Sequence, residues 1–336
     1  MNILTTELAE FTYAQILDGL PTQQAIFDSC QWIHDHPTCQ LKHEKLCDGF
    51  LEKAREFRSH FDPSTLVFGK DVLAAFQKSQ PGSKEFNLRL IELVVVACHQ
   101  IGASLFKLDG GGHRHEVHNS WLAKARQEEE TGTKRRLYHP PPAAFFHRFY
   151  ERHEQYPMGV ADVVGYWSEG RIFGGVVVFD RGESEQECKD MWIHGILAKG
   201  PRTLYPPTKE QFEALVAFLL ADLSSGLHVD CPLPIHGTRL NRPRWDPWLS
   251  MRFHIFRDRY ERVIPARPPP HRVTHTFTHW PELEDQWVIT EMDMRRESGQ
   301  PVDKEVLKRA YEGLTLLTPS SLLWRPRIPE YTHEGC

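Results

Sequence analysis

Helical and strand-like patterns occupy different parts of this chain. The apolar residues within 41–61 and within 86–105 recur at helical spacing, and the second segment is apolar enough to be a central helix. Residues 160–167 and 172–179 are instead rich in β-branched and aromatic residues, and the turn-like sequence Ser168–Arg171 between them predicts a β-hairpin. Because the helices precede the strands instead of alternating with them, the sequence predicts a mixed α/β fold of the α+β type. In this fold a helical N-terminal third packs on a central sheet that contains the hairpin. A Rossmann-like three-layer α/β fold is the alternative.

Four further elements have local signals. A helix is expected from Pro21 to His36, with Pro37 as its stop, and a third strand at 191–197. Thr208 and Gln211 form a capping-box pattern that opens a helix with apolar residues up to Leu223 and Gly226 just beyond its end. A last helix should run from Asp303 to about Glu312, with Gly313 as its cap.

The composition changes abruptly at 109–142, where a triple glycine, an acidic run, a basic run and a triple proline follow one another. This mixture predicts an exposed loop with one short helix at 121–127. The expected organisation is therefore a helical region at 1–108, the exposed loop at 109–142, and a mixed α/β catalytic region at 143–336. At 336 residues these parts fit one compact unit near the upper size for a single core.

The chain lacks the signals of membrane, secreted and nucleotide-binding proteins. It contains no run of about 18 uncharged apolar residues, and the acidic N-terminus does not resemble a secretion signal. Its seven cysteines form no C-x-x-C pair, which fits a reducing compartment. The P-loop, dinucleotide-binding and nucleophile-elbow motifs are absent. We therefore expect a soluble, cytoplasmic protein.

Residues 239–272 contain nine arginines, no lysine and only three acidic residues, within a chain of net charge −5. Aromatic residues are interleaved among these arginines. Guanidinium groups bind phosphate bidentately and stack on bases, so the segment suits RNA. The equally weighted alternative is that the arginines pair with acidic groups of the same chain. The predicted RNA-binding residues are Arg242, Arg244, Arg257, Arg259 and Arg262.

Two other groups of residues are candidates for chemistry. If 145–156 is helical, Tyr150 and Glu154 lie on one face, where a phenol beside a carboxylate can relay protons. A solvated helix face with salt bridges is the alternative. Beyond the predicted strand, Asp180 and Glu183 are placed to receive a cationic group such as a guanidinium.

A histidine cluster follows the triple glycine. His113, His115 and His118 are close enough in sequence to bind zinc or iron. They lie in the segment expected to be exposed, whereas metal sites need ligands held on rigid elements, and this position weighs against metal binding.

Five segments within 154–262 carry a resemblance to known proteins: Glu154–Pro157, Asp162–Trp167, Gly174–Arg181, Asn241–Arg244 and Ile255–Arg262. Through them the chain resembles a large set of fungal proteins, and in that set it is similar to the fungal arginine-containing cyclodipeptide synthases. Bacterial cyclodipeptide synthases are similar in having a tyrosine and a glutamate four apart on a helix with a proline soon after, which would be Tyr150, Glu154 and Pro157 here. The bacterial G-x-S-x-x-N nucleophile loop is absent, so the nucleophile stays open.

The resemblance implies synthesis of an arginine-containing cyclic dipeptide from arginyl-tRNA and a second charged tRNA, with no cofactor. It implies catalytic roles for Tyr150, Glu154 and Tyr166, with the arginines above docking the tRNA. The substrate-binding residues that it implies are Asp180, Arg181, Glu183, His194 and Asp258. Two alternatives remain: a metal-dependent tailoring enzyme that uses His113, His115 and His118, and a non-catalytic binding protein.

Overall fold

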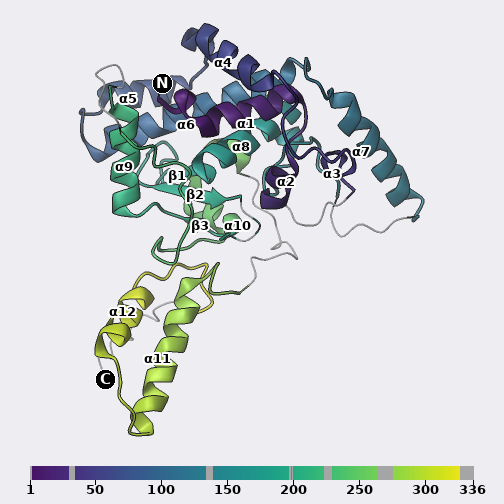
Figure 1. Ribbon diagram of the computed structural model, residues 1–336. Helices are drawn as coiled ribbons and strands as arrows, with labels where there is room; N and C mark the ends of the chain where they lie inside the picture. The colour runs from purple at the N-terminus through teal and green to yellow at the C-terminus, as the bar shows by residue number, and fades with distance from the viewer. Residues whose placement is uncertain are drawn as a thin grey trace, which may run out of the picture.

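The computed structural model describes residues 2–29, 35–133, 139–196, 198, 200–222, 229–262 and 275–325. It is an α+β fold in which helices surround one small antiparallel sheet (Figure 1). The N-terminal helices are α1 (Glu7–Asp18), α2 (Gln23–Ser29), α3 (Pro37–Gln40), α4 (Phe50–His60), α5 (Lys70–Lys78), α6 (Lys84–Lys107) and α7 (His115–Glu130). The later elements are α8 (Val160–Phe173), β1 (Gly175–Asp180), β2 (Met191–Gly195), β3 (Leu204–Tyr205), α9 (Lys209–Leu220), α10 (Pro247–Ser250), β4 (Ile255–Phe256), α11 (Pro281–Glu297) and α12 (Lys304–Leu314). Short 3₁₀ turns are η1 (Asn2–Thr5), η2 (Pro63–Thr65), η3 (His153–Gln155), η5 (Met251–Phe253) and η6 (Arg259–Glu261).

The predicted central helix is confirmed as α6. It packs along α8 and also contacts α1 and α5. Among the described residues α6 is the one helix long and apolar enough to cross a membrane. Of its apolar 18-residue stretch, however, 72% is buried inside the protein. Such burial is typical of the core helix of a soluble protein, because a membrane-spanning helix would present its apolar surface to lipid.

The sheet has the strand order β3-β2-β1-β4, and every pair is antiparallel. Side chains alternate between the two faces of β1, so the sheet separates two apolar clusters. Val177 and Phe179 join the larger cluster, together with α1 and α6. Val176 and Val178 join the smaller one, which contains Tyr150, Tyr156 and Tyr166. Both faces of the sheet are therefore covered.

The predicted hairpin at 160–179 is wrong in its first half. Residues 160–173 form α8, which is buried on nearly all sides, and the hairpin is made by β1 and β2 instead. A helix buried all round has the same continuous apolar pattern as a buried strand, so periodicity does not separate the two. Gly165 allows α8 to approach α6 closely, since a Cβ there would lie 2.7 Å from the His99 ring. Gly174, with φ of 91°, ends the helix.

Other local predictions are confirmed in part. The capping box of α9 is confirmed, with Gln211 N–H donating to Thr208 Oγ1 and Thr208 N–H to Gln211 Oε1, although the helix ends at Leu220 and residues 223–228 lie outside the described part. The strand expected at 191–197 is confirmed as β2, which ends at Gly195; Ile196 lies outside the strand, and Leu197 is not among the described residues. The helix begun by Asp303 is confirmed as α12, but Gly313 lies inside it and is not its cap.

The short helix expected at 121–127 is confirmed as part of the longer helix α7, whereas the exposed-loop prediction for 109–142 is wrong for residues 115–120 and 128–130, which also belong to α7. The predicted helix at 21–36 is shorter: α2 ends at Ser29, residues 30–34 are not described, and Pro37 begins α3.

At the C-terminal end, α11 and α12 pack against each other and project from the rest of the protein (Figure 1). Arg242 pairs with Asp285 at their base. Thr203 Oγ1 donates to the His279 carbonyl at 3.0 Å, and Thr318 Oγ1 donates to the Arg244 carbonyl at 2.5 Å. The pair is thus attached through Thr203, just before β3, and through the segment between β3 and α10.

Candidate functional site

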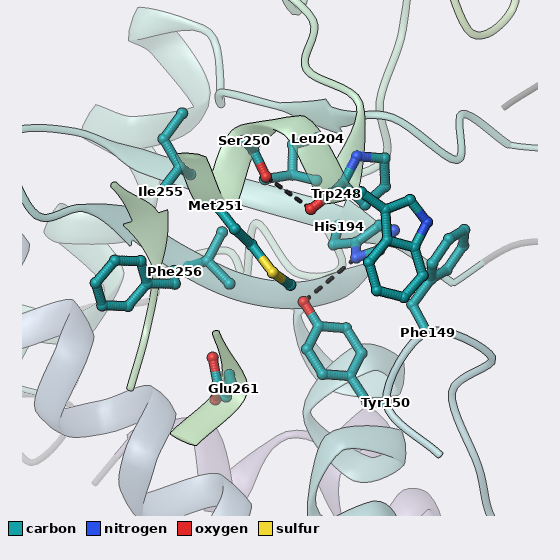
Figure 2. A pocket seen from close by; sticks show the side chains of 12 residues that line it. Phe149, Tyr150, His194, Leu204, Trp248, Ser250, Met251, Ile255, Phe256 and Glu261 are labelled. Carbon is teal, nitrogen blue, oxygen red and sulfur yellow. Dashed lines mark hydrogen bonds between the residues drawn. The ribbon is translucent and has the colours of Figure 1, made fainter. Parts of the chain in front are cut away.

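A small cavity lies against the smaller apolar cluster (Figure 2). The sheet contributes Val178, His194 and Leu204 to its wall. The short helix α10 and the 3₁₀ turn η5 that follows it, together called the 247–253 turns, contribute Trp248 and Met251. In Figure 2 the Met251 side chain extends toward the Tyr150 hydroxyl. The cavity is about 20 Å³, which is room for a single water molecule. A substrate would therefore fit only if some of the residues that line the cavity moved.

Tyr150 and His194 form the polar pair of this cavity. The Tyr150 hydroxyl lies 3.3 Å from Nδ1 of His194, and both side chains are buried. The Tyr150 ring stacks on Tyr166, with ring centroids 4.6 Å apart. Burial, and then the nearby charge of Glu261, raises the pKa of Tyr150 well above its usual value. Burial, and then the proximity of His147, lowers the pKa of His194 well below its usual value. Both groups are therefore neutral at physiological pH.

Glu261 provides a carboxylate at the same cavity. It accepts hydrogen bonds from the Tyr166 hydroxyl and, at 3.2 Å, from the backbone N–H of Arg257. The Arg257 guanidinium also lies 3.2 Å from Glu261 Oε1. Burial raises the pKa of Glu261 above its usual value, because the opposing effect of the Arg257 charge is smaller than the effect of burial.

A buried charge network lies behind the cavity. The Arg257 guanidinium also pairs with Glu169 of α8, whose other oxygen accepts the N–H of Val177 at 2.6 Å. His99 of α6 lies 2.9 Å from Asp162 and 3.6 Å from Glu169. Burial alone lowers the pKa of His99, but its hydrogen bonds to the two carboxylates raise it above the ordinary value. The network joins α6, α8, β1 and the 257–261 segment, and it fixes the position of Glu261.

The structure brings together three of the predicted site residues, Tyr150, Tyr166 and His194, but not Glu154. The helix expected at 145–156 is wrong, because residues 145–152 form bends and turns and only 153–155 form a 3₁₀ turn. Glu154 is 76% exposed and lies 3.2 Å from His153. The expected Tyr150–Glu154 relay is therefore not formed, and the carboxylate that lines the same cavity as Tyr150 is Glu261.

Four of the predicted substrate-binding residues do not line the cavity: Asp180, Arg181, Glu183 and Asp258. Arg181 is buried, lies 2.8 Å from Glu92 and donates to the carbonyls of Phe256 and Arg257. Its guanidinium holds the chain together and is not free to bind a substrate. Asp180 accepts the Gly182 N–H at 2.9 Å, and Glu183 is exposed. Asp258 lies 3.3 Å from the Arg257 guanidinium and accepts from Tyr260 at 3.0 Å.

Each of the five arginines expected to bind RNA has a partner within the chain. Arg242 pairs with Asp285, Arg262 pairs with Glu185, and Arg259 lies 3.7 Å from Glu185. Arg244 is buried over the Tyr205 ring, 5.2 Å from its centroid. Since Arg257 and Arg244 are buried, they offer no surface to phosphate, which corrects the expectation for these two. Of the five arginines, Arg259 has the most exposed side chain, at 69%.

The three histidines 113, 115 and 118 do not face one another. His115 stacks on Phe106, with ring centroids 3.8 Å apart. His118 packs against His36 and Trp121, and burial lowers its pKa to about 4. His113 turns toward His43 instead. The predicted three-histidine metal set is therefore not formed.

Sequence reasoning missed the carboxylates that organise the site. Asp162 and Glu169 are acidic residues within an otherwise apolar helix, and both are buried. Charged residues are almost never fully buried without a partner, so these two carry a signal for an internal network. That signal is visible only once 160–173 is recognised as a helix.

Comparison with protein-family models, with curated proteins and with solved structures finds no match to this chain.

Proposed function

We propose that this chain is an enzyme that uses Tyr150, His194 and Glu261 for general acid–base catalysis on a substrate bound beneath the 247–253 turns. The observation that carries the proposal is that three titratable side chains, Tyr150, His194 and Glu261, line one small cavity. A phenol hydrogen-bonded to an imidazole, with a carboxylate at the same cavity, is a set of side chains that general acid–base catalysis uses. A purely structural cluster is the competing explanation, and the variants below separate the two.

The proposed proton path runs from the substrate through the Tyr150 hydroxyl to His194. The 3.3 Å separation allows the phenol to pass its own proton to Nδ1 while it takes one from the substrate. The imidazolium that results would lie in a buried cavity that also contains the Glu261 carboxylate, which would stabilise it. Tyr166 and Arg257 position Glu261 and do not themselves exchange protons with the substrate.

The narrower proposal is that the reaction is aminoacyl-tRNA-dependent synthesis of an arginine-containing cyclic dipeptide in the cytoplasm. It rests on the resemblance of residues 154–262, a range that contains Tyr166, His194 and Glu261. In this proposal His194 takes the proton from the attacking α-amino group, a role first expected of Glu154. The ester bond to tRNA supplies the activation, so no ATP site is needed. Exposed Arg259 remains available to the tRNA.

The test is to express the protein in a bacterial host and to search extracts by mass spectrometry for arginine-containing diketopiperazines. The informative variants are Tyr150→Phe, which keeps the stacked ring, and His194→Asn, which keeps a polar atom near the Nδ1 position. A positioned acid–base group is worth about 10²–10⁴-fold in rate, so we expect product to fall by that factor in His194→Asn and by less in Tyr150→Phe.

Exposed Glu154 provides the matched control, because Glu154→Gln should leave product formation unchanged. A large loss in Glu154→Gln, with full activity in the other two variants, would place the chemistry outside this cavity. Absence of any diketopiperazine when the purified protein is supplied with a full set of charged tRNAs would reject the narrower proposal. Circular dichroism of each variant separates lost activity from lost folding.

A further inference from the structure

We propose that Asp18, His43, Cys47 and His113 bind one zinc ion that ties three N-terminal segments together. These residues take no part in the Tyr150 cavity, so this proposal is independent of the proposed function. Asp18 ends α1, His43 and Cys47 lie between α3 and α4, and His113 lies between α6 and α7. The sequence placed His113 in a different metal set, with His115 and His118, which the structure does not form.

The four donor atoms are close enough to share an ion. One ligand atom from each residue lies within 4.8 Å of the others. Asp18 Oδ2 and His43 Nε2 are 3.1 Å apart, and Cys47 Sγ and His113 Nε2 are 3.5 Å apart. Tetrahedral zinc with bonds of about 2.0–2.3 Å separates its ligand atoms by roughly 3.3–3.8 Å. Small side-chain rotations therefore suffice to complete the site.

The hydrogen bonds of His43 favour a cation at this position. Its Nδ1 lies 3.0 Å from the carbonyl oxygen of Pro21, which can only accept, so Nδ1 carries the hydrogen. Nε2 then faces the Asp18 carboxylate with a lone pair unless a proton or a metal ion lies between them. A ligand histidine whose second nitrogen donates to a carbonyl is the usual arrangement in metal sites.

Asp18 supplies a second, independent observation. Its side chain is 0% exposed, and within the described residues its Oδ1 has no hydrogen-bond partner. Its other oxygen, Oδ2, lies near His43 Nε2 and accepts the Cys47 N–H at 2.8 Å. A buried carboxylate oxygen without a partner is costly, and coordination to a cation would remove that cost.

The backbone around the cluster is arranged to bring His113 onto Asp18. The His113 N–H donates to the Asp18 carbonyl at 2.7 Å. A Cβ at Gly19, where φ is +98°, would lie 1.5 Å from the His113 carbonyl, and a Cβ at Gly111 would lie 2.6 Å from the Asp18 carbonyl. Only glycine permits these approaches. The ligands are thus held on fixed backbone, which metal sites require.

The chemistry of the set favours zinc and a structural role. Two imidazoles, a thiolate and a carboxylate are ligands that zinc accepts, and four protein ligands leave no position for a substrate. On binding, the Cys47 thiol loses its proton to solvent and a Zn–S bond forms. The doubly charged ion then balances the Asp18 carboxylate and the Cys47 thiolate, so the completed site is neutral, as a half-buried site requires.

The experiment measures metal in the full-length protein directly. After removal of metal with a chelator and reloading with zinc, elemental analysis of the gel-filtered protein should give one zinc per chain. Loading with Co²⁺ should give the near-ultraviolet charge-transfer band of a thiolate–cobalt bond. Cys47→Ser should abolish the band, and both Cys47→Ser and His113→Asn should weaken zinc binding by more than about tenfold.

Two control variants share the residue types but not the cluster. Cys231→Ser alters an exposed cysteine, and His115→Asn alters a histidine that stacks on Phe106. Both should retain zinc and the cobalt band. Wild-type protein that retains far less than one zinc per chain, or a cobalt band that survives in Cys47→Ser, would overturn the proposal. Because metal content is measured without any reaction, failure here leaves the Tyr150 proposal standing, and the converse also holds.

Discussion

Replacing Arg257 with alanine should destabilise the protein strongly. The Arg257 side chain is 2% exposed and contacts Glu169 and Glu261, whose side chains are equally buried. Removing one partner of a buried ion pair costs about 3–5 kcal/mol, because the remaining charge is left without compensation. Here two carboxylates lose their cation, and the guanidinium also leaves the face of Tyr166, 4.9 Å from the ring centroid. We therefore expect a loss of about 4 kcal/mol in the free energy of unfolding, measured by urea denaturation.

Arg259→Ala is the matched control. The Arg259 side chain is 69% exposed, and its replacement removes only an ion pair with Glu185 at 3.7 Å. Exposed pairs contribute about 0–1 kcal/mol, so this variant should unfold nearly as the parent does. The double variant Arg257→Met with Glu169→Gln should recover part of the loss, because it removes one uncompensated charge. A loss below about 1 kcal/mol in Arg257→Ala would refute the internal-network explanation and return Arg257 to the candidates for RNA binding.

Three further outcomes are expected from the same packing. Burial lowers the pKa of four histidines, His36 to about 3 and His118, His147 and His279 to about 4. Because the unfolded chain takes up these protons first, the urea midpoint should fall as the pH drops from about 6.5 toward 4, and a flat midpoint would contradict this. Gly165→Ala should lower the free energy of unfolding by about 1–3 kcal/mol, because the added Cβ would lie 2.7 Å from the His99 ring. Gly69→Ala should lower it much less, because the added Cβ would lie 3.6 Å from the nearest side-chain atom. Thr208→Ala should lower the free energy of unfolding by about 1 kcal/mol through loss of the α9 cap, and an unchanged melting temperature would argue against that contribution.

Local signals were enough for the elements whose determinants are adjacent in sequence. The capping box at Thr208, the start of α12 at Asp303 and the long apolar helix α6 were all predictable, because a cap or a repeating apolar face is completed within a few residues. The order of helices before strands was likewise sufficient to predict the α+β class. The burial of Tyr166 and His194 near Tyr150 was not predictable from such signals.

Tertiary structure decided the identity of α8 and the partners of every charged group in the site. Residues 160–173 have a pattern compatible with strand or buried helix, and only the packing of α6 against Gly165 selects the helix. The density of arginines was visible in the sequence, but Arg257 meets Glu169 across 88 positions and His99 across 158. Such pairings depend on which segments the whole core brings together. The sequence by itself therefore determined the elements that local hydrogen bonds and periodicity can complete. The fold alone determined which charges are buried side by side, because burial is a property of the assembled core.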